Sequence, residues 1–245
     1  MIVESLEPDV LSDPDLGWVA SGKSGAPALV AFGGLRGGLM MPPFEFFRTV
    51  KSLDVTMVMI RDLAQVWYLQ GVAGLADSLL GVAPALSEVL AEFAPARTVV
   101  TGNSAGAYMA MLVGAALQAE RVVAFSPQTY LDEERRTRHS DRRWREEIAH
   151  RRSLADHDLG EDLLPLLERL PGPGRAEVYF SEHHARDASH AERLGRIPWV
   201  DLRPLDSDDH RAILHLKRSG VLQSLLLDAL GSPTVHSAPE ADAQP

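Results

Sequence analysis

The 245-residue chain contains no cysteine. This absence excludes disulfide bonds, thiolate metal sites and cysteine nucleophiles. No apolar run approaches the roughly 18 residues needed to cross a bilayer, and the weakly polar stretch 107–117 is too short. The first ten residues are acidic where a signal peptide has a basic start and an apolar run, so we expect a protein without a signal peptide that stays in the cytoplasm.

An excess of positive charge is also missing. The formal net charge is −10, which opposes binding to nucleic acids and to anionic membranes, and we expect neither as a partner. Hydrophobic residues make up 45% and charged residues 24% of the chain, as in an ordinary soluble globular protein. The length is sufficient for one large domain with a buried core.

Short apolar runs alternate with helical patterns along most of the chain. Strands are expected at 17–20, 28–32, 55–60, 98–101, 122–125, 176–180 and 199–202, and helices at 44–50, 75–93, 107–117, 188–194 and 211–230. Continuous apolar strands joined by crossover helices indicate an α/β fold with a mostly parallel central sheet flanked by helices.

The alternation stops at residues 128–174, which are strongly charged and contain the run RRTRHSDRRWREE. We expect a short helical insertion here, a lid over the sheet within a single domain that covers residues 1–230. Residues 231–245 are rich in proline, alanine and acid, and we expect them to form a disordered tail.

The run Gly102-Asn103-Ser104-Ala105-Gly106 fits the G-x-S-x-G pattern of a nucleophile elbow. Glycine on both sides lets a strand and a helix pass closely, while the serine sits on the strained turn between them. The helix N-terminus favours negative charge that develops beside it. The apolar strand before the motif and the alanine-rich helix after it support this interpretation, against the alternative of a glycine-rich turn without chemistry.

A serine nucleophile needs a base and a carboxylate that orients the base, in the chain order Ser, acid, His. His210 follows the last expected strand and is the predicted base, with His215 as a competitor inside the final helix. Asp187 is the preferred acid, and Glu182 stays open as the alternative. Ordinary explanations also exist, since a histidine can start a helix and Asp187 can cap one.

Histidines gather near the predicted acid, at His183, His184 and His190. A His/His/Asp set can bind a metal ion, but the chain has no cysteine ligand and no H-E-x-x-H pattern. We therefore expect no metal and no cofactor.

The run of residues 32–38, FGGLRGG, predicts an oxyanion loop after the first central strand. An oxyanion hole needs two N–H donors aimed at the tetrahedral intermediate. Ala105, the residue after the nucleophile, is the expected first donor, and Leu35 is the expected second donor, with Gly34 as the next choice. A flexible glycine turn is the alternative.

Together the GGLRGG loop, the GNSAG elbow, Asp187 before HAERL, and His210 before a long final helix resemble the α/β-hydrolase superfamily, over residues 26–230. The resemblance implies a Ser-Asp-His triad and hydrolysis or transfer of acyl groups. Two features depart from the common pattern. Gly33-Gly34 stands where many members have His-Gly, and the loop before Asp187 is longer than usual.

Ligands in this kind of sheet bind beyond the carboxyl ends of the strands. Three segments are therefore expected to line the pocket, and the substrate-binding candidates in them are Met40, Arg61, Gln65, Trp67, Tyr68 and Gln128. For Trp67 and Tyr68, packing against the insertion is an equally good alternative.

The insertion is rich in arginine, at Arg135, Arg136, Arg138, Arg142, Arg143 and Arg145. One interpretation is a basic rim for an anionic substrate, such as an acyl group carried by phosphopantetheine or coenzyme A. The plainer and preferred interpretation is a solvated helix face, because acidic residues alternate with the arginines at pairing distance.

The pattern predicts a serine hydrolase that cleaves a small acyl ester, thioester or amide through an acyl-enzyme on Ser104. An acyltransferase that uses the same acyl-enzyme is the alternative within this chemistry. A non-catalytic ligand-binding protein of the same fold is the alternative outside it. Aspartate-nucleophile chemistry is disfavoured because serine occupies the elbow.

Overall fold

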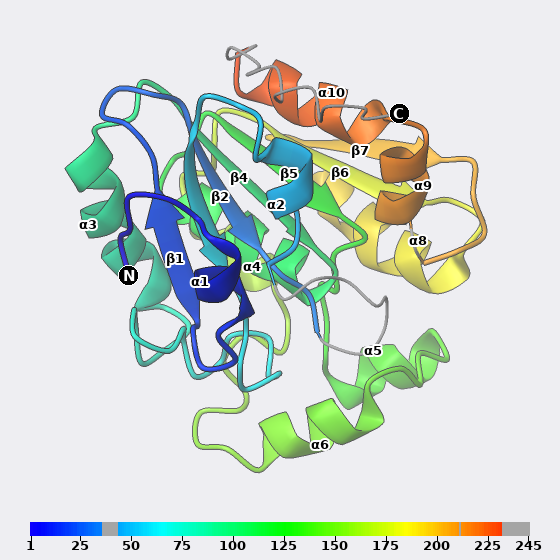
Figure 1. The fold of residues 1–245 in the computed structure, drawn as a ribbon. Helices are drawn as coiled ribbons and strands as arrows, with labels where there is room; N and C mark the ends of the chain where they lie inside the picture. Colours follow the sequence, from blue (N-terminus) through cyan, green and yellow to red (C-terminus); the bar gives the residue numbers. More distant parts are fainter. Residues whose placement is uncertain (36–43, 211, 232–245) are drawn as a thin grey trace, which may run out of the picture.

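The computed structural model describes residues 1–35, 44–210 and 212–231. Seven strands form one sheet in the order β1-β3-β2-β4-β5-β6-β7 (Figure 1). All neighbouring strands are parallel except β1, which runs antiparallel to β3 at the edge. The strands are β1 (Trp18–Ser21), β2 (Ala28–Phe32), β3 (Thr56–Ile60), β4 (Thr98–Asn103), β5 (Arg121–Phe125), β6 (Ala176–Ser181) and β7 (Val200–Leu205). The predicted mostly parallel sheet is confirmed.

Helices cover both faces of the sheet (Figure 1). They are α1 (Pro8–Ser12), α2 (Phe47–Val50), α3 (Val82–Phe93), α4 (Ala105–Ala116), α5 (Glu133–Arg138), α6 (Arg145–Arg152), α7 (Leu164–Leu167), α8 (Ala185–Glu192), α9 (Ala212–Arg218) and α10 (Val221–Ala229), with a 3-10 turn at Arg193–Arg196. α3, α4 and α8 pack in one hydrophobic core, and α2, α9 and α10 in another.

The strand sequences explain this two-sided packing. In β2, Val30 and Phe32 face the first core, whereas Leu29 and Ala31 face the second. Side chains alternate across a strand, so a sheet that is covered on both faces needs apolar residues at every position. This is why the central strands read as unbroken apolar runs.

The two longest predicted helices differ from the structure. The helix expected at 75–93 begins only at Val82, because the preceding residues form turns, with the Val72 N–H donating to the Ala76 carbonyl (2.8 Å). The helix expected at 211–230 is broken into α9 and α10 at Gly220. Gly220 has φ +75°, a conformation that ends a helix and that glycine adopts without strain.

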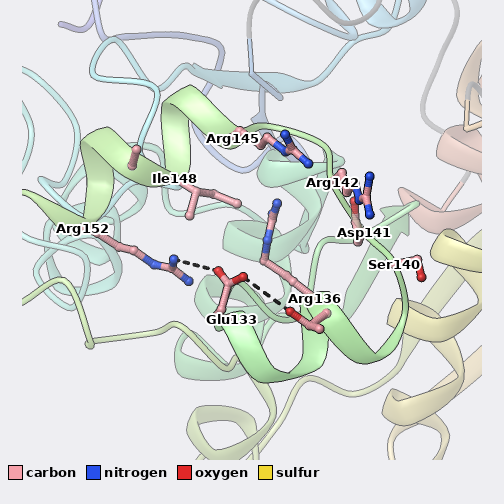
Figure 2. A pocket seen from close by; sticks show the side chains of 10 residues that line it. Glu133, Arg136, Ser140, Asp141, Arg142, Arg145, Ile148 and Arg152 are labelled. Atoms are coloured by element: carbon pink, nitrogen blue, oxygen red, sulfur yellow. Dashed lines mark hydrogen bonds and ion pairs between the residues drawn. The ribbon is translucent and has the colours of Figure 1, made fainter.

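The predicted insertion lies between β5 and β6 and contains α5, α6 and α7. Figure 1 shows α5 and α6 beyond the carboxyl end of β5, outside the two helix layers. Between these two helices lies a cavity of about 600 Å³, which is lined by side chains of the insertion (Figure 2). The predicted tail at 231–245 falls outside the described residues except for Gly231. In the part of the chain that the structure describes, no helix is long and apolar enough to cross a membrane.

Candidate active site

Ser104 lies on a tight turn between β4 and α4. Its backbone angles are φ 56° and ψ −116°, and its side chain is almost fully buried. A Cβ atom on Gly102 would stand 2.2 Å from the Gly106 carbonyl oxygen, and one on Gly106 would stand 2.2 Å from the Phe32 carbonyl oxygen. Both glycines are therefore required by close backbone contact, and this turn has the geometry expected of an elbow.

The turn is held to the neighbouring strand. The Ser104 N–H donates to the Phe125 carbonyl at the end of β5 (2.9 Å). Ala105 begins α4, so its N–H belongs to the first turn, where backbone donors have no partner within the helix. The start of α4 therefore places a backbone N–H directly beside the serine, and its role as an oxyanion donor stays a prediction.

His210 and Asp187 are in contact. His210 Nδ1 lies 2.8 Å from both carboxylate oxygens of Asp187, whose side chain is 1% exposed. Asp187 lies in the first turn of α8, not in the loop before the helix, because α8 starts three residues earlier than expected. Glu182, the alternative acid, is exposed and lies 3.7 Å from His183. The structure therefore brings Asp187, and not Glu182, to His210.

The Asp187 carboxylate leaves one nitrogen of His210 available. With Nδ1–H donating to Asp187, Nε2 carries the lone pair that can accept a proton. His210 Nε2 and Ser104 Oγ are both buried, and neither has a hydrogen-bond partner within the described ranges. Buried polar atoms without partners are rare, and at a strained turn they are consistent with a site that completes its hydrogen bonds with a substrate.

Arg143 joins the insertion to this pair. Its Nη1 donates to Asp187 Oδ1 (2.9 Å), while its Nε and Nη2 bind both oxygens of Asp141. Burial raises the pKa of Asp187, but the contacts with His210 and Arg143 outweigh it and hold the pKa below its usual range. The carboxylate is therefore kept charged, as an orienting group for His210 must be.

Asp141 is itself fixed by a buried histidine. His190 Nε2 lies 3.2 Å from Asp141 Oδ2, and His190 Nδ1 accepts the Thr129 N–H (3.0 Å). Burial lowers the pKa of His190 to about 4, so this ring is neutral at pH 7. An acceptor at Nδ1 requires the proton to be on Nε2, which donates it to Asp141.

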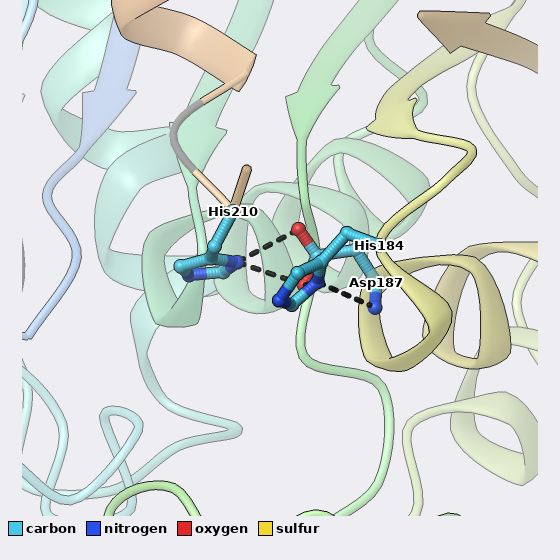
Figure 3. A group of neighbouring side chains, drawn as sticks. All are labelled: His184, Asp187 and His210. Atoms are coloured by element: carbon cyan, nitrogen blue, oxygen red, sulfur yellow. Dashed lines mark hydrogen bonds and ion pairs between the residues drawn. The ribbon is translucent and has the colours of Figure 1, made fainter. Parts of the chain in front are cut away.

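A third ring completes the group around the acid. Asp187, His184 and His210 place their ligating atoms within 4.8 Å of one another (Figure 3). However, His184 Nδ1 accepts the backbone N–H of Asp187 (3.3 Å) and His210 Nδ1 faces the carboxylate. Both nitrogens therefore have hydrogen-bond partners within this group.

The start of the predicted oxyanion loop lies beside the elbow. A Cβ atom on Gly34 would stand 2.9 Å from the Asn103 carbonyl oxygen and 3.6 Å from Ser104 Cβ. Tyr68 Oη donates to the Gly33 carbonyl (2.7 Å) and fixes the loop from below. Leu35 is buried and is the last described residue before the gap at 36–43, so its role as donor stays a prediction, as does that of Gly34.

A buried acid stands behind this loop. Burial raises the pKa of Glu45 to about 7, although the Gly34 backbone and the Asn103 side chain lower it in part. Glu45 is 7% exposed and its Oε2 has no hydrogen-bond partner among the described residues. Glu45 is therefore a titratable neighbour both of Asn103, which precedes the nucleophile, and of Gly34 in the predicted oxyanion loop.

Several predicted substrate-binding residues have protein partners. The Arg61 guanidinium donates to the Leu16 carbonyl (2.5 Å), and Trp67 Nε1 donates to Gln128 Oε1 (2.8 Å). Trp67 and Tyr68 are fully buried in the first core, and the nearby Arg151 of α6 donates to Val66. The structure thus supports the packing alternative for both rings. Gln65 and Gln128 stay predictions, and Met40 lies outside the described residues.

The arginines of the insertion divide into two groups. Arg135 pairs with Asp132 and Asp162, and Arg138 pairs with Glu134, as a solvated helix face predicts. Arg136, Arg142 and Arg145 have no carboxylate partner among the described residues and line the cavity between α5 and α6.

Sequence reasoning missed several of these residues. Arg143 was one of many arginines in a charged run, and nothing in its spacing singled it out. Glu45 did carry a signal, because it is a lone acid in the aromatic run FEFF, which indicates burial. His184 was noted only as a member of a histidine cluster.

Comparison with solved structures places this geometry among known folds. The capsule O-acetyltransferase of Neisseria meningitidis serogroup A aligns with a TM-score of 0.64 at 12% identity, over 84% of this chain and 90% of that chain. The esterase Est2 of Thermogutta terrifontis, solved with propionate bound, aligns at 0.54 and 14% identity, over 90% and 91%. The serine hydrolase FphF of Staphylococcus aureus aligns at 0.53 and 14% identity, over 89% and 88%.

No protein-family model and no curated protein sequence matches the chain. The likeness therefore lies in the arrangement of strands and helices and not in the sequence. With its sheet order, the elbow after β4, and esterases and serine hydrolases among its structural neighbours, the chain has the α/β-hydrolase fold.

Proposed function

We propose that this protein is an enzyme that cleaves or transfers acyl groups through an acyl-enzyme on Ser104. The observation that carries the proposal is the coincidence of a strained, buried serine with a His210–Asp187 pair at the same edge of the sheet. Ser104 follows β4, Asp187 follows β6 and His210 follows β7, and these strands lie in the order β4-β5-β6-β7. The carboxyl ends of parallel strands meet at one edge of the sheet.

The proposed chemistry gives each of these residues one role. Ser104 Oγ attacks the acyl carbon and His210 Nε2 takes its proton, while Asp187 holds Nδ1–H and stabilises the imidazolium. The N–H groups of Ala105 and Leu35, with Gly34 as the alternative to Leu35, bind the oxyanion. His210 then protonates the leaving group, and an incoming water or other acceptor attacks the acyl-enzyme with His210 as base.

Acyl transfer is a second candidate, since the final step differs only in the acceptor. An O-acetyltransferase is among the structural neighbours, and a histidine variant of that protein has been solved in complex with CoA. An acyl donor bound to CoA or a carrier is therefore part of the proposal. A small-molecule acyl ester cleaved by water is the other form of the same reaction.

The test is active-site labelling combined with turnover. A fluorophosphonate probe should label the wild-type protein at Ser104, and Ser104→Ala should lose label and turnover of p-nitrophenyl acetate by about 10³-fold or more. His210→Gln and Asp187→Asn should each lower kcat by large factors. Acetyl-CoA with alcohol or amine acceptors then distinguishes transfer from hydrolysis.

The matched control is Ser126→Ala. Ser126 is also a buried serine, follows the neighbouring strand β5, and has no partner for its hydroxyl in the described part of the chain. This variant should keep label and turnover. Undiminished turnover in a folded Ser104→Ala variant would refute the acyl-enzyme. Failure of the probe to label the folded wild-type protein would favour a ligand-binding protein.

A further inference from the structure

The cavity between α5 and α6 has a distinct composition. Its volume of about 600 Å³ is within the range of small-molecule sites. Its lining contains four arginines and two carboxylates, and the complete set is Glu133, Arg136, Thr137, Ser140, Asp141, Arg142, Arg145, Ile148, Ala149 and Arg152. In a protein of net charge −10, this is a local concentration of positive charge.

Both carboxylates already have partners. Glu133 Oε2 accepts from Arg152 (3.0 Å), and Asp141 is bound by Arg143 and His190, which are outside the lining. Four arginines against two carboxylates leave the lining with an excess of two positive charges. Among the described residues, Arg136, Arg142 and Arg145 have no carboxylate at ion-pair distance.

Arg136 is the most informative of the three. Its side chain is buried, and Nη2 donates to the Arg143 carbonyl (2.7 Å). Figure 2 shows its guanidinium rising from α5 into the space below Arg142 and Arg145. Asp141 and Glu133 attract this charge from the cavity wall, but no carboxylate of the described residues lies at ion-pair distance from Arg136. A buried guanidinium without a direct ion pair is costly, and an anion in the cavity would supply that pair.

The cavity is next to the candidate active site. Asp141 and Arg142 line it, and the following residue, Arg143, donates to Asp187 (2.9 Å). One peptide bond thus separates a cavity-lining arginine from the residue that touches the triad acid. The cavity is thus connected to the Asp187 side of the candidate site through Arg143.

We propose that this cavity binds the phosphate groups of the acyl donor, and that the donor is a thioester of the coenzyme A class. Guanidinium groups bind phosphate oxygens in a bidentate manner, and three of them around one cavity match a ligand with several phosphates. The proposal rests on the proposed function, because it assigns the acyl end of the same ligand to Ser104.

The test uses CoA binding and two thioesters with the full chain. Binding of CoA to the Ser104→Ala variant, measured by calorimetry, should weaken about 100-fold or more in the background of Arg142→Gln with Arg145→Gln, at about tenfold for each guanidinium. In the enzyme that retains Ser104, the two substitutions Arg142→Gln and Arg145→Gln should raise the KM for acetyl-CoA. The KM for S-acetyl-pantetheine, which lacks the phosphates, should change less.

Arg138→Gln is the matched control. It removes one positive charge from α5, but Arg138 is outside this cavity and pairs with Glu134. It should change neither CoA affinity nor the ratio of the two KM values. Folding is checked by circular dichroism, and the exposed positions of Arg142 and Arg145 favour folded variants.

Three outcomes would overturn the proposal. They are unchanged CoA affinity in the double variant, an equal loss in Arg138→Gln, and binding of inorganic phosphate without any binding of CoA. The binding measurement involves no chemistry, so it decides on the cavity even if Ser104→Ala retains full esterase turnover and the proposed function fails.

Discussion

The elbow at Ser104 and the junction at Arg143 lie at the same edge of the sheet but are held by different forces. At the elbow, backbone atoms of β2, β4 and α4 are in such close contact that only glycine fits at Gly102 and Gly106. At the junction, Asp141, Arg143 and Asp187 are drawn together by charge. The first region depends on excluded volume, and the second depends on charged side chains that compensate one another.

This difference has a consequence for how each region tolerates change. Steric contact between backbones cannot be relieved by a side-chain rotation, whereas a charged network can exchange partners or admit water. We therefore expect the elbow to fail completely when altered and the junction to weaken by degrees.

The largest loss of folding stability is expected from Gly106→Ala. The new Cβ would stand 2.2 Å from the Phe32 carbonyl oxygen, so β2 and α4 must separate and the folded state should be lost. Urea unfolding followed by circular dichroism measures this. Gly195→Ala is the control, because its Cβ would meet only the flexible end of Leu202 at 3.1 Å. Similar stabilities of the two variants would contradict the steric account of the elbow.

A smaller loss of folding stability is expected from Asp141→Asn. The change leaves Arg143 with one carboxylate instead of two and removes the charged partner of His190, and breaking a buried pair costs about 3 to 5 kcal/mol. The measurement is the free energy of unfolding in urea at pH 7. Asp206→Asn removes an exposed carboxylate and should be neutral within about 0.5 kcal/mol. A neutral Asp141→Asn would show that water replaces the network without cost.

Glu45→Gln tests the elbow's titratable neighbour. The raised pKa means that the folded protein keeps a proton between pH 4.5 and about 7 that the unfolded chain releases. Stability of the wild type should therefore fall as pH rises through this window, and Gln should remove the fall. The variant should gain up to about 3 kcal/mol over the wild type at pH 8 relative to pH 4.

The Glu45→Gln measurement is urea unfolding of both proteins across that pH range. Glu182→Gln provides the control for loss of one exposed carboxylate. A difference between Glu45→Gln and the wild type that does not change with pH would contradict the buried, protonated state of Glu45.

The smallest effect is expected from Arg138→Ala at the surface of the insertion. Arg138 and Glu134 form an exposed i,i+4 pair, and such pairs contribute about 0.5 kcal/mol or less. Thermal unfolding should shift by no more than about 2 °C. A larger shift, comparable with that of Asp141→Asn, would mean that charge at the surface and charge at the junction are equivalent.

The sequence carries enough information to predict the elbow and the sheet. Gly102 and Gly106 are local signals, and unbroken apolar strands follow directly from a sheet that is covered on both faces. The pairing of His210 with Asp187 could be expected from chain order, although Asp187 lies within α8 and not before it.

The junction could not be predicted in the same way. Arg143 lies 44 residues from Asp187 in the chain, so this contact forms only when the insertion and α8 come together in the folded protein. Its other partner, Asp141, is two residues away in the chain, but a short spacing of opposite charges is common in the whole charged run. The fully buried positions of Trp67 and Tyr68 likewise depend on Asp62, whose carboxylate accepts N–H groups of the Asp62–Tyr68 loop. The contact of Arg143 with Asp187 is tertiary, and the hydrogen bonds of Asp62 belong to an irregular loop, so neither follows from a periodicity in the sequence.

The backbone of Ser104 has a consequence for the history of the chain. The angles φ 56° and ψ −116° lie outside the left-handed helical region, and an L-residue there stores about 1 to 3 kcal/mol of strain that glycine would release. Ser104→Gly should thus give a protein that is more stable than the natural one. Selection for thermal stability alone would favour glycine over serine at this position. A serine here is therefore explained by a requirement other than stability.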